Sequence, residues 1–152
     1  MKKGVISLYR YYLMMRHMQS RFLHELGSGD WHTLAEKNPK YLGFLMTVDP
    51  PAIFLSLWQA NLYVVIEGWH KLGLSNPKVD ALLLSPNVEA LKLHRHGTFH
   101  YHEELIPRLY RKLLVSADAV DWTHNLSEAF KQFFDAALLD PEFAKSALNE
   151  EV

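Results

Sequence analysis

Apolar residues along the chain recur at helical spacing, and no stretch alternates as a half-buried strand does. In residues 5–26 one apolar line runs through Ile6, Tyr9 and Leu13, and Gly27-Ser28-Gly29 follows it. This pattern predicts a first helix over 5–26 that ends at the glycines. Residues 28–49 have no clear period, so we expect a long connection there with a helical turn at about 31–37.

The second predicted helix has the clearest boundaries. Asp49 is an N-cap acid, the two prolines after it suit a first turn, and Gly73 suits a C-cap, so the helix should run over about 50–72. Its apolar residues lie almost all round: Ile53, Phe54, Leu55, Leu57, Trp58, Leu62, Tyr63, Val64, Val65, Ile66 and Trp69. A helix in a small bundle needs only one apolar stripe. The excess therefore predicts that part of this helix meets a second copy of the chain in a homodimer.

Two residues inside this helix stand out. Glycine in a helix interior lowers stability by roughly 1 kcal/mol relative to alanine. Gly68 therefore predicts a close approach of another helix at this position. Glu67 lies among apolar neighbours, where we expect a structural carboxylate rather than a catalytic one.

The rest of the chain also reads as helix. The predicted segments are a short helix from Ser75-Asn76-Pro77 through Leu84, one from Ser85-Pro86 toward Arg95 that Gly97 interrupts, one beginning between 98 and 101 and continuing through Leu114 with a disturbance at Pro107, and one from Asp118 to about Leu139. We predict one all-α domain over residues 1–152, a bundle of four to six helices with an acidic tail that frays from about 141.

Composition narrows the possible classes of protein. The 152 residues include no Cys, which excludes a disulfide scaffold and thiol catalysis, and which is compatible with a reducing cytoplasm. The formal net charge of −1 provides no global basic field, so any RNA must bind a local patch or one built by two subunits. Residues 50–66 are short for a membrane span and lead into Glu67, and the N-terminus lacks a signal-peptide pattern. We therefore expect a cytoplasmic protein without a membrane partner.

Candidate chemistry gathers at His94-Arg95-His96-Gly97-Thr98-Phe99-His100-Tyr101-His102-Glu103-Glu104, which holds four of the nine histidines. Metal-free cleavage of RNA needs a base for the 2′-OH proton, a donor for the leaving 5′-oxygen and positive charge on the phosphate. Histidine performs the first two tasks near neutral pH, and the guanidinium of arginine suits the third. The candidate catalytic residues are Arg95, His96 and His100.

The string Arg95-His96-Gly97-Thr98-Phe99-His100 resembles the Arg-polar-x-x-x-His motif of HEPN domains (higher eukaryotes and prokaryotes nucleotide-binding). The resemblance implies a helical bundle with Arg95 at a helix junction. It also implies a metal-independent endoribonuclease that needs no cofactor and leaves a 2′,3′-cyclic phosphate. His100 would be the general acid/base, Arg95 the phosphate clamp, and His96 would orient or contact the phosphate. Two motifs would face each other across a homodimer.

The same resemblance implies a setting in toxin–antitoxin or phage-defence systems, with an antitoxin or other regulator as a possible partner. Some members of the family are not catalytic. The alternative function is therefore a HEPN-like helical module that binds RNA, a nucleotide or a protein partner.

Other interpretations of the cluster stay open. His96 and His100 with His102, Glu103 and Glu104 could form a zinc site, although Gly97 argues against a rigid ligating helix and no His-Glu-x-x-His motif occurs. The histidines could also be solvated residues at a helix end, with His94 and His102 at the rim.

A second arginine and histidine, Arg10 and His17, satisfy a loose form of the motif within the first helix. Arg10, Arg16, His17 and Arg21 alternate with aromatic residues there, which can mark an RNA-facing surface. The other interpretation is that the aromatics belong to the core and the arginines are solvated.

Overall fold

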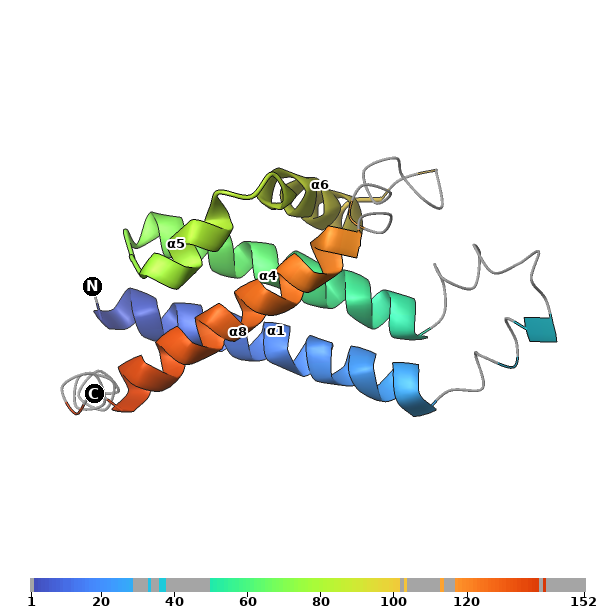
Figure 1. Ribbon diagram of the computed structural model, residues 1–152, viewed down its shortest axis with the longest axis horizontal. Helices are drawn as coiled ribbons and strands as arrows, with labels where there is room; N and C mark the ends of the chain where they lie inside the picture. Colours follow the sequence, from blue (N-terminus) through green and yellow to red (C-terminus); the bar gives the residue numbers. More distant parts are fainter. Residues whose placement is uncertain are drawn as a thin grey trace.

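The computed structural model describes residues 2–28, 33, 36–37, 50–101, 103, 113, 117–139 and 141 (Figure 1). Its helices are α1 (Lys2–Ser28), α4 (Pro50–Lys71), α5 (Pro77–Leu83), α6 (Asn87–Phe99) and α8 (Ala117–Leu139). These ranges contain helix and no strand, so the predicted all-α class is confirmed.

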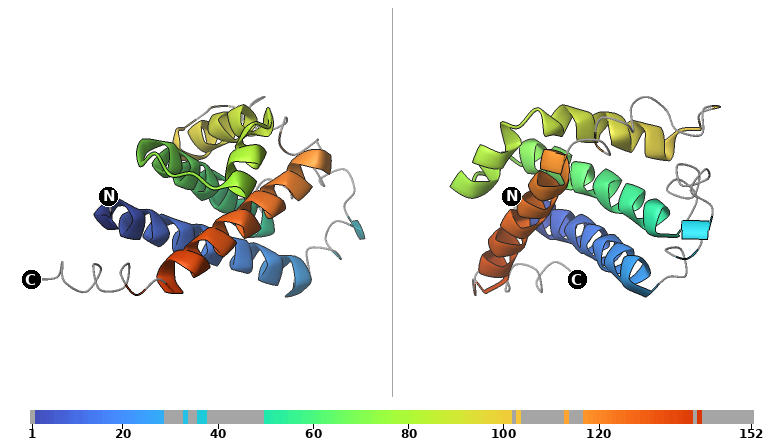
Figure 2. Two further views of the ribbon diagram at one scale, coloured as in Figure 1. Left: turned by 60° about the vertical axis from the view of Figure 1, so that its left-hand side comes forward. Right: turned by 45° about the vertical axis from the view of Figure 1, so that its right-hand side comes forward.

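Helix α4 lies between α1 and α6, and it contacts both (Figure 2). Trp69 near its end also meets α8, with ring centroids 5.5 Å from Phe130 and 4.7 Å from Phe133. The apolar residues of α4 thus face three helices of the same chain. Other apolar residues of this helix stay exposed, as Ile53 does at 47%. None of the described helices combines the length and apolar content needed to cross a bilayer.

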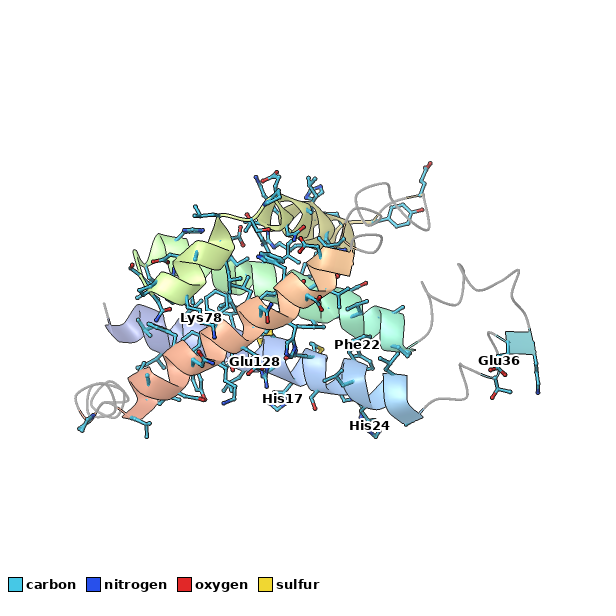
Figure 3. All side chains as sticks on the ribbon, viewed as in Figure 1. His17, Phe22, His24, Glu36, Lys78 and Glu128 are labelled. Carbon is cyan, nitrogen blue, oxygen red and sulfur yellow. The ribbon has the colours of Figure 1, made fainter. Side chains whose placement is uncertain are left out.

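The contact between α1 and α4 is close because two glycines face leucines across it. A Cβ atom at Gly68 would overlap Leu8 Cδ1, and one at Gly4 would overlap Leu72 Cδ2. The predicted close approach at Gly68 is therefore confirmed. Further along the same contact, Phe22, labelled in Figure 3, lies on α1. Its ring stacks on Trp58 of α4 with centroids 5.8 Å apart.

Helix α8 crosses the other helices diagonally (Figure 1) and is attached to α1 and α5. Its Phe134 lies 4.8 Å from the ring of Tyr12 on α1. The indole Nε1 of Trp122 donates to the carbonyl of Leu82 on α5 at 2.9 Å. The contact between Phe134 and Tyr12 buries apolar surface. The hydrogen bond from Trp122 fixes the end of α5 against α8.

Local signals set the helix boundaries around α5 as predicted. The side chain of Asn76 accepts from the backbone N–H of Lys78 at 3.0 Å and of Val79 at 3.3 Å, with Pro77 in the first turn. Gly73 has φ +60°, in the left-handed region that favours glycine.

Gly73 N–H donates to His70 O at 3.1 Å, and Leu74 N–H donates to Trp69 O at 3.2 Å. These two bonds are the Schellman pattern of a helix C-terminus.

Helix α6 differs from the prediction. It continues through Gly97 to Phe99 instead of stopping at the glycine. Gly97 is buried and has no positive φ, so burial of this face of the helix outweighs the low helix propensity of glycine. Arg95 consequently lies inside α6, one turn before its end at Phe99. The predicted N-cap Asp49 and, apart from single residues, the turn at 31–37, the helix after 100 and the acidic tail lie outside the described residues.

Candidate functional site

The candidate site lies on the last turns of α6. Ser85 Oγ accepts from the backbone N–H of Asn87 at 3.2 Å, which holds the first turn of the helix. Leu91, His94 and Gly97, spaced three residues apart, form the buried stripe of α6. The residues between them therefore point toward the flanks and the solvent, and these include Arg95 and His96.

His96 and His100 form a pair of exposed imidazoles. Their ring centroids lie 4.3 Å apart, with an angle of 37° between the planes. His100 leaves the helix with φ −117° and ψ 140°, and its backbone N–H donates to His96 O at 3.1 Å. This last helical bond keeps the two side chains one turn apart on the same side of α6. The structure thus brings together two of the three predicted catalytic residues.

Arg95 forms an ion pair that the sequence did not reveal. Its Nη2 lies 3.5 Å from Glu67 Oε2 on α4, and the side chains are 41% and 44% exposed. Glu67 is therefore an exposed carboxylate that is paired with Arg95, while Ile66 beside it is buried. The spacing of 28 positions along the chain gives no local signal for this pair, because it depends on how α6 lies on α4.

The pKa of Tyr63 responds to the charges of the Arg95–Glu67 ion pair. Burial raises the pKa of Tyr63, and the nearby carboxylate of Glu67 raises it further. Glu89 and Lys92 of α6 act on the same hydroxyl and are themselves paired, with Lys92 Nζ 3.4 Å from Glu89 Oε2. Tyr63 thus lies beside two carboxylates and the cations that pair with them.

His94 was expected at the rim, and this expectation is wrong. Its side chain is fully buried and interacts with the backbone of Ser56 on α4. Burial lowers the pKa of His94 to about 4, so the ring is neutral at pH 7. The residue therefore anchors α6 to α4 directly before Arg95.

The zinc-site alternative and the second Arg–His pair can be compared with the described residues. Among the described residues, no group of three or more His, Asp or Glu side chains could hold a metal ion. His102 and Glu104, two members of the alternative zinc set, lie outside the described residues. The loose motif of Arg10 and His17 lies on α1, on the far side of α4 from α6, as Figure 3 shows for His17.

On α1 itself, Tyr12 is buried and Phe22 packs against the core, whereas Arg10, His17 and Arg21 are exposed. Most of these burials agree with aromatic residues in the core and basic residues in solvent, but Tyr11 is 42% exposed and Arg16 is half-buried and paired with Glu128 on α8. They leave Arg95, not Arg10, beside a pair of imidazoles.

A groove between α1 and α4 borders the ion pair. Its volume is about 570 Å³, and its lining consists of Gly4, Ser7, Leu8, Tyr11, Val64, Glu67, Gly68, Lys71 and Leu72. The floor is mainly apolar, while Glu67 and Lys71 supply opposite charges one helical turn apart. Glu67 is shared between this groove and Arg95.

Comparison of the chain with protein-family profiles, with curated proteins and with solved structures finds no match.

Proposed function

We propose that the chain is a metal-independent endoribonuclease of the HEPN type, with Arg95, His96 and His100 at its active site. The observation that carries this proposal is the pair of exposed imidazoles, with ring centroids 4.3 Å apart, on the turn of α6 in which Arg95 directly precedes His96. The resemblance of residues 95–100 to the HEPN motif supports the same assignment.

The chemistry assigns a role to each side chain. His100 exchanges the proton in the reaction, since imidazole is both a base and an acid near neutral pH. Arg95 binds the phosphate and stabilises the charge that develops on its oxygens. His96 orients the ring of His100 and contacts the phosphate.

The geometry of the imidazole pair supports a site shared by two chains. In cleavage by the 2′-OH, the attacking and leaving oxygens lie roughly in line through phosphorus, so base and acid must stand on opposite sides. Rings with centroids 4.3 Å apart are near contact and leave no room for a phosphate between them. One chain therefore supplies one side of the reaction, and a second copy supplies the other.

Cleavage of single-stranded RNA in the presence of EDTA tests this proposal. We expect the wild-type protein to cleave, and Arg95→Ala and His100→Ala each to abolish cleavage while the dimer measured by sedimentation stays intact. Retained cleavage by His100→Ala would overturn the residue assignment. Loss of activity in EDTA with recovery on adding zinc would replace it with the metal site.

The concentration dependence of the rate tests the shared site separately. Cleavage per chain should rise with protein concentration through the range in which dimers form. RNA binding without cleavage by dimeric protein would favour the alternative, a non-catalytic module that binds RNA, a nucleotide or a protein.

A further inference from the structure

Glu67 stands between two cations. Its Oε2 is 3.5 Å from Nη2 of Arg95 on α6, and Lys71 follows it by four residues on α4. Residues four apart on a helix are neighbours, and Glu before Lys is the favourable order for an ion pair. Both Glu67 and Lys71 line the groove between α1 and α4. The carboxylate therefore has two partners within reach, one in the candidate site and one in the groove.

A phosphate on Arg95 has to compete with this carboxylate. The guanidinium presents its donors as a planar fork, and Glu67 Oε2 lies 3.5 Å from one of its terminal nitrogens, Nη2, so a phosphate that binds through this nitrogen meets the carboxylate. Phosphate and carboxylate are both anions, so their simultaneous contact with one guanidinium is unfavourable.

The neighbouring charged residues do not compensate the negative charge of Glu67. The neighbouring Lys92 is paired with Glu89 at 3.4 Å. Glu67 and Glu89 thus balance Arg95 and Lys92 within this patch.

The groove between α1 and α4 can accommodate the carboxylate of Glu67 when a phosphate displaces it from Arg95. Its volume of about 570 Å³ exceeds the space that one side-chain rotation requires, and it opens toward Lys71. The side chain of Glu67 is 44% exposed, so no core packing holds it against Arg95. Rotation toward Lys71 exchanges one exposed ion pair for another at little cost in free energy.

We infer that Glu67 is a two-position counter-ion that controls the access of phosphate to Arg95. It pairs with Arg95 in the empty site and turns to Lys71 when an RNA phosphate binds. This inference rests on the proposed role of Arg95 as the phosphate clamp. Glu67 acts through Arg95 and does not itself touch the reacting atoms, so it sets the affinity for the phosphate without taking part in the chemistry.

Binding can be measured without cleavage by using single-stranded 2′-O-methyl RNA of about 12 nucleotides, which lacks the attacking hydroxyl and has a length within the range that such sites cover. Fluorescence anisotropy at fixed ionic strength gives Kd for the full chain, and circular dichroism verifies the fold of each variant. Glu67→Gln keeps the shape of the side chain and removes the charge. Glu89→Gln removes the same charge from the neighbouring pair and is the matched control.

We expect Glu67→Gln to bind this RNA about fivefold more tightly, the upper range for an exposed ion pair. Glu89→Gln should change Kd by less than about twofold, because its partner is Lys92. Lys71→Gln should weaken binding about two- to threefold by removing the second position of Glu67. In the Glu67→Gln background, Lys71→Gln should have no effect, because the two residues then no longer interact.

The outcomes separate this inference from the proposed function. If Arg95→Gln leaves Kd unchanged, Arg95 is not a phosphate clamp, and both proposals are overturned. If Arg95→Gln weakens binding while Glu67→Gln and Glu89→Gln act alike, the inference about Glu67 alone is overturned. If Lys71→Gln weakens binding equally in both backgrounds, Lys71 contacts the RNA directly, and the two-position mechanism is wrong.

Discussion

The fully buried ring of His94 lies against the backbone of Ser56, and this contact joins α6 to α4 one residue before Arg95. A neutral imidazole can be buried in this position far more easily than a charged one. The attachment of the candidate site to the bundle therefore depends on the protonation of a residue outside the predicted catalytic set.

Stability should fall as the pH drops from about 6.5 to 4. Within this window the unfolded chain protonates His94, whose ordinary pKa is 6.5, whereas the folded chain, with a pKa of about 4, does not. The unfolded state binds the extra proton, so the loss amounts to about 3 kcal/mol over the whole window. Urea denaturation at a series of pH values measures this slope.

The variant His94→Gln removes the titrating group, so its stability should depend much less on pH between 6.5 and 4, at the cost of lower stability at pH 7. His124→Gln, at an exposed position on α8, is the control and should keep the wild-type slope. An unchanged slope in His94→Gln would show that another group causes the pH dependence.

Gly68→Ala should destabilise the protein even though alanine favours a helix. The added methyl group would overlap Leu8 Cδ1, and Leu8 is itself buried in the core. Overpacking costs about 1–3 kcal/mol, and the better helix propensity returns about 1 kcal/mol, so we expect a net loss of about 1 kcal/mol. Thermal or urea denaturation measures this loss.

Gly27→Ala is the matched control for Gly68→Ala. Nothing lies within 4 Å of its added methyl group, and the residue is exposed near the end of α1. A gain of about 0.5–1 kcal/mol is expected there. Equal effects of the two substitutions would contradict the close contact of α1 with α4.

Asp80→Asn should loosen the junction between α4 and α5. The carboxylate accepts from Trp69 Nε1 at 3.1 Å, from Ser75 Oγ at 2.7 Å and from the Asn76 N–H at 3.0 Å. An amide would turn donors toward donors or lose one of these bonds, so Tm should fall. The bonds from Ser75 and Trp69 lower the pKa of Asp80 below its ordinary 3.8.

The contribution of Asp80 to stability is therefore present above pH 3.8 and is lost as the pH falls through its lower folded pKa. This window lies below that of His94, so the two can be distinguished in one titration. Asp121→Asn, at an exposed position on α8, should leave Tm nearly unchanged. A similar fall in Tm in both variants would indicate a general charge effect.

His96→Gln and His100→Gln should separate positioning from proton transfer. Loss of the group that exchanges the proton should lower kcat about 10²- to 10⁴-fold. Loss of the positioning residue should lower kcat about tenfold and leave the pH profile in place. Single-turnover RNA cleavage between pH 5 and 9 measures both, and equal profiles in the two variants would mean that neither ring alone carries the proton.

Much of the fold could be predicted because its signals are local. The apolar spacing in 5–26, 50–72 and 118–139 predicted the three long helices, Gly73 predicted the end of α4, and Ser75-Asn76-Pro77 predicted the start of the short helix α5. The prediction that Gly97 interrupts the helix was wrong, because the burial of Gly97 offsets the low helix propensity of glycine. The apolar residues of α4 could not be divided by sequence between contacts within the chain and exposed positions such as Ile53, because that division depends on how α1, α6 and α8 pack on the helix.

For the candidate site, too, some features could be predicted from the sequence and others depended on the tertiary structure. The sequence by itself determined the helical class and singled out Arg95, His96 and His100 as candidates, because residue chemistry and spacing within one turn are visible along the chain. The tertiary structure decided that His94 is buried against Ser56, that Glu67 pairs with Arg95, and that a groove lies beside this pair. These features arise from the way α6 and α1 lie on α4. Helix packing is set by many weak contacts between distant residues, which no local pattern encodes.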